Sequence, residues 1–226
     1  MKLPSHNQYD KKWAESKGVK ELKIVTPHLT NSRVCLDIGA HIGATAIKYS
    51  KIFDTVYSFE PTSYLYDLLE ENTKDFKNII SFNVAVSNAD GKVQIYENNK
   101  NSESNVVVHD DTLPLIKSRL GNRFSAEPKE VTSKAIDNCK FDNVDFIKID
   151  VERYTIPVIE GMIKTLENNS PVIQVEVEDI TSITSRTQKL LNTLGYQVYH
   201  KSKYDWFYKK MKENLNPDNI LTSPRW

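Results

Sequence analysis

Acidic residues stand at three points of the chain where a short apolar run stops. Asp37 and Gly39 close the run RVCLDI, Glu60 follows TVYSF, and Asp150 with Glu152 follows VDFIKI. Parallel strands end at one edge of a sheet, so these carboxylates are expected to converge there. Carboxylates at such an edge can bind hydroxyl groups, attract a cation or accept a proton.

The spacing of the first two acids favours a ligand that contains adenosine. Glu60 lies 23 positions after Asp37, and an acid about 20 positions past a glycine turn suits hydrogen bonding to both hydroxyls of a ribose. The loop D-I-G-A-H-I-G lacks the third glycine of a dinucleotide-binding loop, and its acid would repel a pyrophosphate. A carboxylate there prefers a cationic group such as an ammonium or a sulfonium.

Glycine is scarce in this chain, which makes its positions informative. There are seven glycines, against about 16 expected for this length, and Gly39 and Gly43 share one short loop. We expect the loop to need glycine for its backbone, and a side chain at Gly39 to enter the volume of a ligand. His41 lies in the same turn, where exposure to solvent is the simpler explanation of its position.

Alternating strands and helices must position these residues. The sequence predicts strands over 33–38, 55–59, 79–86, 144–149, 171–177, 196–200 and 206–210. Residues 92–96 alternate as the hairpin partner of 79–86 would. The stripe Ile156, Ile159, Ile163 and Leu166 predicts one helix behind the fourth strand. This order is typical of an α/β fold whose mostly parallel sheet has helices on both faces.

The length of 226 residues favours one main domain. We predict an N-terminal helical cap over 1–30, the main domain over 31–210 and a C-terminal tail over 211–226. Residues 98–130 are the least regular segment, and we predict that they form an insertion or lid.

Composition excludes several classes of protein. Hydrophobic residues make up 39% of the chain, which excludes a disordered protein, and 30 basic residues balance 30 acidic ones. No net charge therefore recommends nucleic acid or a membrane surface as a partner. Cys35 and Cys139 are too few for a disulfide framework, and no signal peptide is visible. We therefore expect a cytoplasmic protein. The five histidines show no spacing typical of metal ligands, so we predict no metal site.

Four separated blocks of sequence resemble one enzyme family. In order along the chain they are D-x-G-A-x-x-G, F-E-P, N-x-A-V-S-x-x-D-G, and K-I-D-V-E followed by V-I-E-G. Together they resemble FkbM-type methyltransferases over roughly residues 33 to 200. The resemblance implies a Rossmann-like class I methyltransferase fold, S-adenosylmethionine as the cofactor, and a hydroxyl group as the usual methyl acceptor.

The resemblance also implies which residues bind the cofactor. Asp37, Gly39, Ala40, His41 and Gly43 would form the loop at its methionine side, and Glu60, followed by Pro61, would hold the ribose. Asn83 and Ala85 would lie at the edge of the adenine, and Asp150 would lie beside the methyl group.

The chain departs from the family after the fourth strand. The family usually shows D-V-E-G-x-E, whereas Arg153 replaces the glycine here and Thr155 replaces the second acid. Loss of the glycine restricts the backbone, and loss of the acid removes a candidate base. Arg153 would instead suit an anionic acceptor, such as a phosphorylated or carboxylated sugar.

Methyl transfer needs a group that orients the acceptor and takes its proton. Asp150 is the first candidate, Glu152 the second and Glu176, at the end of the fifth strand, the third. Alternation places Lys148 and Glu152 on the same face as Asp150, where Lys148 would pair with that acid either for catalysis or to hold the strand end.

Three further functions are compatible with the sequence. The first is a methyltransferase that acts on RNA, because lysines and aromatic residues interleave over residues 200–212, although lysines also protect edge strands. The second is a nicotinamide-dependent oxidoreductase, which the incomplete glycine loop disfavours, and the third is a non-catalytic protein that binds an adenosyl ligand. The preferred interpretation is an enzyme that methylates a hydroxyl of a sugar or other small molecule. The sequence predicts no oligomeric state.

Overall fold

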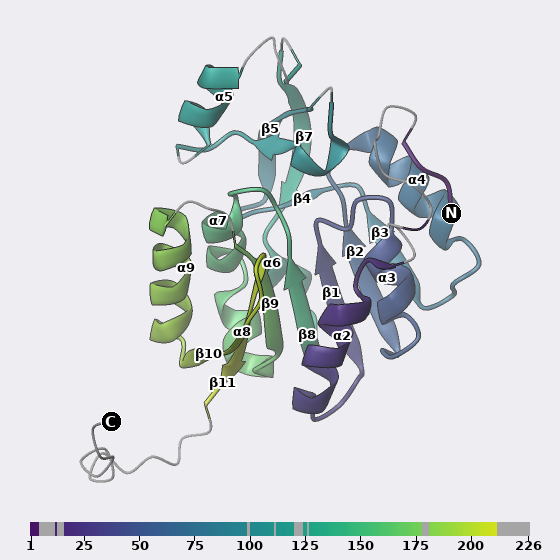
Figure 1. The fold of residues 1–226 in the computed structure, drawn as a ribbon, viewed down its shortest axis with the longest axis vertical. Helices are drawn as coiled ribbons and strands as arrows, with labels where there is room; N and C mark the ends of the chain where they lie inside the picture. Colours follow the sequence, from purple (N-terminus) through teal and green to yellow (C-terminus); the bar gives the residue numbers. More distant parts are fainter. Residues whose placement is uncertain are drawn as a thin grey trace.

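The computed structural model describes residues 1–4, 12, 16–98, 100–110, 112–119, 124–125, 127–177 and 181–211. Apart from Met211, the predicted tail over 211–226 lies outside the described residues, as do parts of the predicted cap and of the segment 98–130. The rest of the chain forms two sheets and the helices that cover them (Figure 1).

The larger sheet has seven strands in the order β10-β11-β9-β8-β1-β2-β3. Its strands are β1 (Val34–Ile38), β2 (Thr55–Phe59), β3 (Ile79–Phe82), β8 (Val144–Ile149), β9 (Val172–Glu176), β10 (Tyr196–Lys201) and β11 (Asp205–Lys210). Strand β11 pairs antiparallel with both β10 and β9, and the other pairs in this sheet are parallel. The predicted α/β fold with a mostly parallel seven-stranded sheet is confirmed.

Helices cover both faces of this sheet (Figure 1). One face carries α2 (Val19–Val25), the 3-10 turn η1 (Thr26–His28) and α3 (Ala44–Tyr49), and α4 (Ser63–Thr73) packs beside β3. The other face carries α6 (Ile136–Cys139), α7 (Thr155–Glu160), α8 (Ile163–Asn169) and α9 (Thr181–Thr193). Because side chains alternate along a strand, Cys35 joins the apolar cluster of Tyr49, whereas Leu36 joins that of Leu166.

A smaller sheet of four strands lies beyond the carboxyl ends of the larger one (Figure 1). Its order is β4-β7-β5-β6, formed by β4 (Ala85–Val86), β5 (Gly91–Tyr96), β6 (Val106–Val107) and β7 (Lys129–Lys134). The segment 98–130 also holds the 3-10 turn η2 (Ser102–Ser104) and helix α5 (Leu113–Arg119).

The prediction of one strand over 79–86 is wrong. The chain leaves the larger sheet after Phe82 and enters the smaller sheet at Ala85. Between them, the side-chain amide of Asn83 donates hydrogen bonds to the carbonyl oxygens of Glu60 and Pro61, at 2.8 and 3.1 Å. If the strand continued, backbone N–H groups of its next residues would need carbonyl oxygens of this neighbouring segment as acceptors. Because the Asn83 side chain occupies them, the strand ends.

The predicted hairpin between 79–86 and 92–96 is also wrong. Strand β7 lies between β4 and β5, and it pairs parallel with β4 and antiparallel with β5. The alternating pattern identified β5 correctly as a strand, but its partner comes from a distant part of the chain.

The predicted single helix behind the fourth strand consists of two helices, α7 and α8, which Gly161 and Met162 separate. A Cβ atom on Gly161 would lie 1.9 Å from the carbonyl oxygen of Ser87. The Gly161 carbonyl accepts a hydrogen bond from the backbone N–H of Asp137 at 2.9 Å. The helix therefore breaks where its backbone meets the segment that enters the smaller sheet.

No helix in the described ranges is both long enough and apolar enough to cross a membrane.

Candidate functional site

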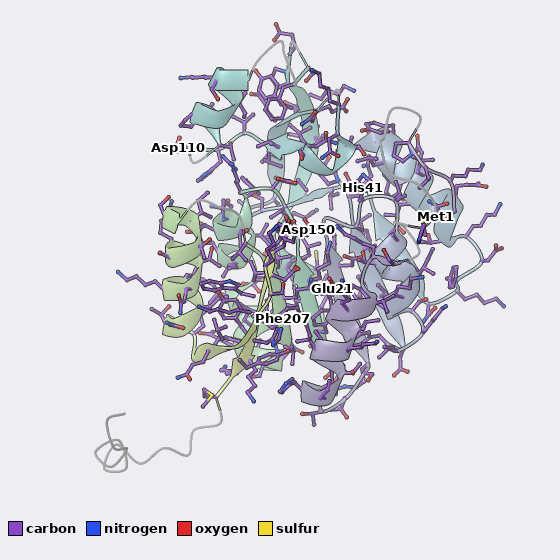
Figure 2. The ribbon with its side chains drawn as sticks, in the orientation of Figure 1. Met1, Glu21, His41, Asp110, Asp150 and Phe207 are labelled. Carbon is purple, nitrogen blue, oxygen red and sulfur yellow. The ribbon has the colours of Figure 1, made fainter. Side chains whose placement is uncertain are left out.

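A cavity lies where the two sheets meet, at the carboxyl ends of β1, β2, β8 and β9. Figure 2 places His41 and Asp150 near this junction. Ten of the predicted site residues line the cavity: Gly39, Ala40, His41, Glu60, Pro61, Ala85, Lys148, Asp150, Glu152 and Glu176. Four do not line it, namely Asp37, Gly43, Asn83 and Arg153.

The loop after β1 needs glycine at Gly39 because another part of the backbone lies against it. Its φ is +79°, and a Cβ atom would lie 1.8 Å from the carbonyl oxygen of Asp150. The prediction that a side chain there would enter ligand volume gives the wrong reason, since the first obstacle is the backbone after β8. Gly39 thus joins the ends of β1 and β8.

Asp37 and Gly43 lie behind the loop. Asp37 is fully buried, and its Oδ2 accepts a hydrogen bond from Thr45 Oγ1 at 2.8 Å. Gly43 has a φ of +84°, and a Cβ atom there would lie 2.7 Å from Leu69 Cδ1. In this structure both residues support the loop from behind the cavity wall.

Glu60 is the buried acid at the end of β2. Its Oε2 accepts a hydrogen bond from the backbone N–H of His41 at 3.0 Å, and its Oε1 accepts one from the N–H of Thr62 at 2.9 Å. Burial raises the pKa of Glu60 to about 7 despite these hydrogen bonds. Both oxygen atoms are held in place at the cavity wall.

Asn83 supports Glu60 from outside the cavity, through the hydrogen bonds to Glu60 and Pro61 that end β3. Among the residues that follow β3, Val84, Ala85 and Val86 line the cavity and give it an apolar wall.

Lys148 is a buried cation between the ends of β1 and β8. Its Nζ lies 3.1 Å from Asp150 Oδ2 and 3.4 Å from Asp37 Oδ1, and donates a hydrogen bond to the carbonyl of Gly39 at 3.0 Å. Burial alone lowers the pKa of Lys148, but the two carboxyl groups raise it well above its ordinary value. The predicted pairing with Asp150 is confirmed, and the same ammonium also holds the Gly39 loop.

Asp150 and Glu176 lie at the ends of neighbouring strands. Their carboxyl groups lie close enough to interact, and a hydrogen bond from Glu176 favours the charged form of Asp150. Burial raises the pKa of Asp150, but the Lys148 ammonium and this hydrogen bond outweigh it, so the pKa lies well below its usual range. Burial and the nearby Asp150 together raise the pKa of Glu176 well above its usual range.

Glu152 and Arg153 form a turn after β8 in which the backbone is left-handed, with φ of +44° and +73°. Strand alternation therefore does not place Glu152 on the face of Lys148 and Asp150, although its side chain does line the cavity. The position where the family usually has glycine keeps a glycine-like conformation with arginine in it.

The segment that covers the cavity lies within residues 98–130, for which the sequence predicted an insertion or lid, although none of its residues was named as a site residue. Asn101, Ser102, Ser104 and Asn105 line the cavity. Ser102 Oγ lies 2.8 Å from His41 Nε2, and Asn105 Nδ2 donates a hydrogen bond to Thr62 Oγ1 at 3.1 Å. Burial lowers the pKa of His41 to about 4, so its ring is neutral in this contact at pH 7. We call residues 100–105 the cover segment, and the asparagine-rich irregularity of the sequence was the only signal of it.

Lys17 and Tyr154 also line the cavity and were missed. Tyr154 is buried, and its hydroxyl lies 2.8 Å from Ser87 Oγ. This contact connects the turn after β8 to the segment that enters the smaller sheet.

Lysines near the C-terminus lie against the chain's own aromatic rings. Lys201 Nζ is 3.6 Å from the ring centre of Trp206, and Lys203 Nζ is 4.8 Å from that of Tyr204. Strand β10, which carries Lys201, is an edge strand, whereas β11 is paired on both sides. This geometry fits lysines that protect an edge strand.

Within the part of the chain that the structure describes, no group of three or more His, Cys, Asp or Glu residues is arranged to hold a metal ion.

Comparison with known proteins gives one family. The family model of the Methyltransferase FkbM domain matches residues 37–199. No curated protein sequence matches the chain.

Several solved structures share the fold. An FkbM methyltransferase from Methylobacillus flagellatus is 17% identical with a TM-score of 0.50, and the match covers 79% of this chain and 43% of that one. A putative methyltransferase from Streptococcus mutans, solved with S-adenosylhomocysteine, is 10% identical with a TM-score of 0.53, over 87% of this chain and 99% of that one. A putative RNA methyltransferase from Pyrococcus horikoshii is 13% identical with a TM-score of 0.50, over 93% and 94% of the two chains. The chain thus spans less than half the length of the Methylobacillus protein, and at these identities the matches establish the fold alone.

Proposed function

Because the chain belongs to the FkbM methyltransferase family, which uses S-adenosylmethionine, we propose that it methylates a hydroxyl group of a sugar or another small molecule. The observation that carries the proposal is that Gly39, Glu60 and Asp150, from three different strand ends, line one cavity. The acceptor class and the roles of individual residues belong to this proposal.

The cavity has the groups that an adenosyl ligand needs. Each carboxylate oxygen of Glu60 accepts one backbone hydrogen bond, which leaves lone pairs for the two hydroxyls of a ribose. Val84, Ala85 and Val86 offer an apolar wall for an adenine ring. Since Gly39 has no side chain, the loop lies close to the end of β8 and brings both ends of the cavity within reach of one ligand.

The end of β8 would serve the acceptor. When bound, S-adenosylmethionine supplies an electrophilic methyl group on a sulfonium sulfur. Asp150 would accept a hydrogen bond from the acceptor hydroxyl and so orient its oxygen. The low pKa of Asp150 means that the proton moves late, as the new carbon–oxygen bond forms and the hydroxyl becomes acidic.

Donor binding is the first test. We expect isothermal titration calorimetry to show saturable binding of S-adenosylmethionine and S-adenosylhomocysteine. The variant Glu60→Ala should weaken it by about 1 to 3 kcal/mol through loss of hydrogen bonds to a charged group. Glu130→Gln changes an exposed acid of the smaller sheet and serves as the control. Unchanged affinity in Glu60→Ala would remove Glu60 from the site, and binding of NAD in place of the adenosyl donor would favour the oxidoreductase.

The acceptor is the second test. Release of S-adenosylhomocysteine should be measured with neutral sugars, phosphorylated and carboxylated sugars, and short RNAs. We expect turnover with a hydroxyl-bearing small molecule. Turnover with RNA alone would replace the proposed acceptor class, and donor binding without any turnover would favour a non-catalytic adenosyl-binding protein.

A further inference from the structure

The ends of β8 and β9 bring two carboxyl groups together in one wall of the cavity. Ile149 and Val175 are partners in the parallel ladder, so Asp150 and Glu176 come next to each other on adjacent strands. Both line the cavity, and their carboxyl groups lie close enough to act on each other's pKa. Two carboxyl groups can share a hydrogen bond only if one of them carries a proton.

The charges around this pair favour a single negative charge on the two carboxyl groups together. The ammonium of Lys148 already faces two carboxyl groups, those of Asp150 and Asp37. Asp150 is in direct contact with Lys148 at 3.1 Å. A third adjacent carboxylate would lie half-buried beside a like charge, which favours the protonated form of Glu176.

Other charged groups near the pair do not reverse this balance. Lys17, from the N-terminal segment, acts on Asp150 and lowers its pKa, which strengthens the preference of Asp150 for the charged form. Asp150 and Glu152 raise the pKa of Glu176, and Asp150 also raises the pKa of Asp205. These acidic neighbours therefore disfavour a further negative charge on either group. The charged or titratable groups that act on the pair are Lys17, His41, Lys148, Glu152 and Asp205.

We propose that Glu176 is a protonated positioning residue, whose carboxyl O–H donates a hydrogen bond to Asp150 and holds the Asp150 carboxylate toward the acceptor hydroxyl. The proposal deepens the proposed function and rests on it for the identity of the acceptor. Glu176 thus differs from a third candidate base, because it donates a proton in a hydrogen bond where a base would accept one.

Every atom in the step is accounted for. The acceptor oxygen forms a bond to the methyl carbon of the donor, and the carbon–sulfur bond breaks with its electron pair passing to sulfur. The hydroxyl proton passes to Asp150, so the pair changes from one proton to two. Release of that proton to water restores the starting state.

Glutamine distinguishes a hydrogen-bond donor from a base at this position. Glu176→Gln keeps a donor N–H of similar length and adds no charge, so we expect turnover within about threefold of the native protein. Glu176→Ala removes the donor, and we expect turnover to fall by about 10- to 100-fold through misplacement of Asp150. A Gln variant as impaired as Ala overturns the proposal, and so does an Ala variant with native turnover.

The pH dependence of kcat gives an independent test of whether Glu176 is protonated. If Glu176 is neutral and donates to Asp150, Glu176→Ala removes a hydrogen bond to the charged form, so the pKa of Asp150 rises and the acid limb of kcat moves toward neutral pH. If Glu176 is charged, its removal lowers the pKa of Asp150 and the limb moves the other way. We expect the first shift in the Ala variant and no shift in the Gln variant.

Infrared spectroscopy tests the proton directly and needs neither donor nor acceptor. At pH 9, where Glu60 with its pKa of about 7 is ionised, we expect the carbonyl stretch of a protonated carboxyl group in the native protein, its loss in Glu176→Gln, and its retention in the control Glu130→Gln. Absence of this band in the native protein overturns the proposal. Failure of the proposed function would appear instead as absent donor binding or absent turnover, so the two failures are distinguishable.

Discussion

The two acidic ends of the cavity hold their carboxyl groups in different ways. At the end of β2, Glu60 is held by the backbone N–H groups of His41 and Thr62. At the end of β8, Asp150 is held by the side chains of Lys148 and Glu176. Backbone N–H groups do not titrate, whereas the side-chain contacts at the end of β8 depend on the protonation of each partner. We infer that the β2 end fixes where a ligand lies through donors that do not titrate, whereas the position of Asp150 at the β8 end depends on the protonation of its neighbours.

The largest expected effect comes from the residue that joins the two ends. In Gly39→Ala, a Cβ atom would overlap the backbone carbonyl of Asp150 at 1.8 Å, in addition to about 1 to 2 kcal/mol for a left-handed non-glycine residue. We expect a loss of several kcal/mol in the free energy of unfolding, measured by urea denaturation, and loss of donor binding.

Gly43→Ala is the matched control for this variant. Its φ is similar, at +84°, but its Cβ atom would meet the side-chain atoms Leu69 Cδ1 and Thr73 Cγ2, at 2.7 and 2.9 Å, which can move. We expect a clearly smaller loss of stability. Equal losses in the two variants would mean that the left-handed backbone alone requires glycine and that the β1–β8 contact adds nothing.

The next effect separates the two ends by function. Asp150→Asn should lower turnover by roughly 100-fold while donor affinity changes little, because the proton acceptor is lost but the Glu60 end is intact. Steady-state kinetics together with donor titration measures both quantities. If donor affinity falls in step with turnover, Asp150 anchors the donor and the distinction between the two ends does not hold.

A smaller effect sharpens the description of the β2 end through pH. Burial raises the pKa of Glu60 to about 7, and hydroxyl donors favour its carboxylate, so donor binding releases a proton wherever Glu60 is protonated. Affinity should therefore rise with pH up to about 7 and become constant above it, with binding about tenfold weaker at pH 6 than at pH 8. Calorimetric titrations at the two pH values measure this difference. In Glu60→Gln, the contribution of Glu60 to this pH dependence of donor affinity should be absent. A pH dependence of the same size in that variant would assign it to another titratable group.

The smallest effect concerns the turn after Asp150. Arg153 has a φ of +73° and does not line the cavity. Arg153→Gly should relieve the left-handed backbone and raise the free energy of unfolding by about 0.5 to 1 kcal/mol, after the greater chain entropy of glycine is subtracted. We also expect the Michaelis constant for each acceptor, charged or neutral, to be the same in the variant as in the native protein. A selective increase for a charged acceptor would assign Arg153 to acceptor binding.

Sequence patterns predicted the larger sheet well because its signals are local. Each strand is a short apolar run, and the residue that follows each run lies at the carboxyl edge, which located Glu60, Asp150 and Glu176. The order of strands and helices along the chain then leaves few possible sheet topologies, and a mostly parallel sheet is the one that it favours.

The smaller sheet escaped prediction because its pairing is not local. Strand β5 pairs with β7, and the segment between them holds β6 and α5. Likewise, a side-chain hydrogen bond from Asn83 ends β3, and close contact with Ser87 breaks the helix at Gly161. Periodicity cannot reveal contacts of this kind, because they depend on residues far apart in the chain.

The cover segment has a kinetic consequence. Hydrogen bonds of Ser102 and Asn105 join it to His41 and Thr62, the same two residues whose N–H groups hold Glu60. A molecule bound at the Glu60 end would lie beside a segment that is attached to the walls of that end. We therefore expect exchange of the spent donor to be slower than the chemical step, so that a rapid first turnover precedes a slower steady state. Weakening the contact between Ser102 and His41 would then speed up repeated cycles without changing the first one.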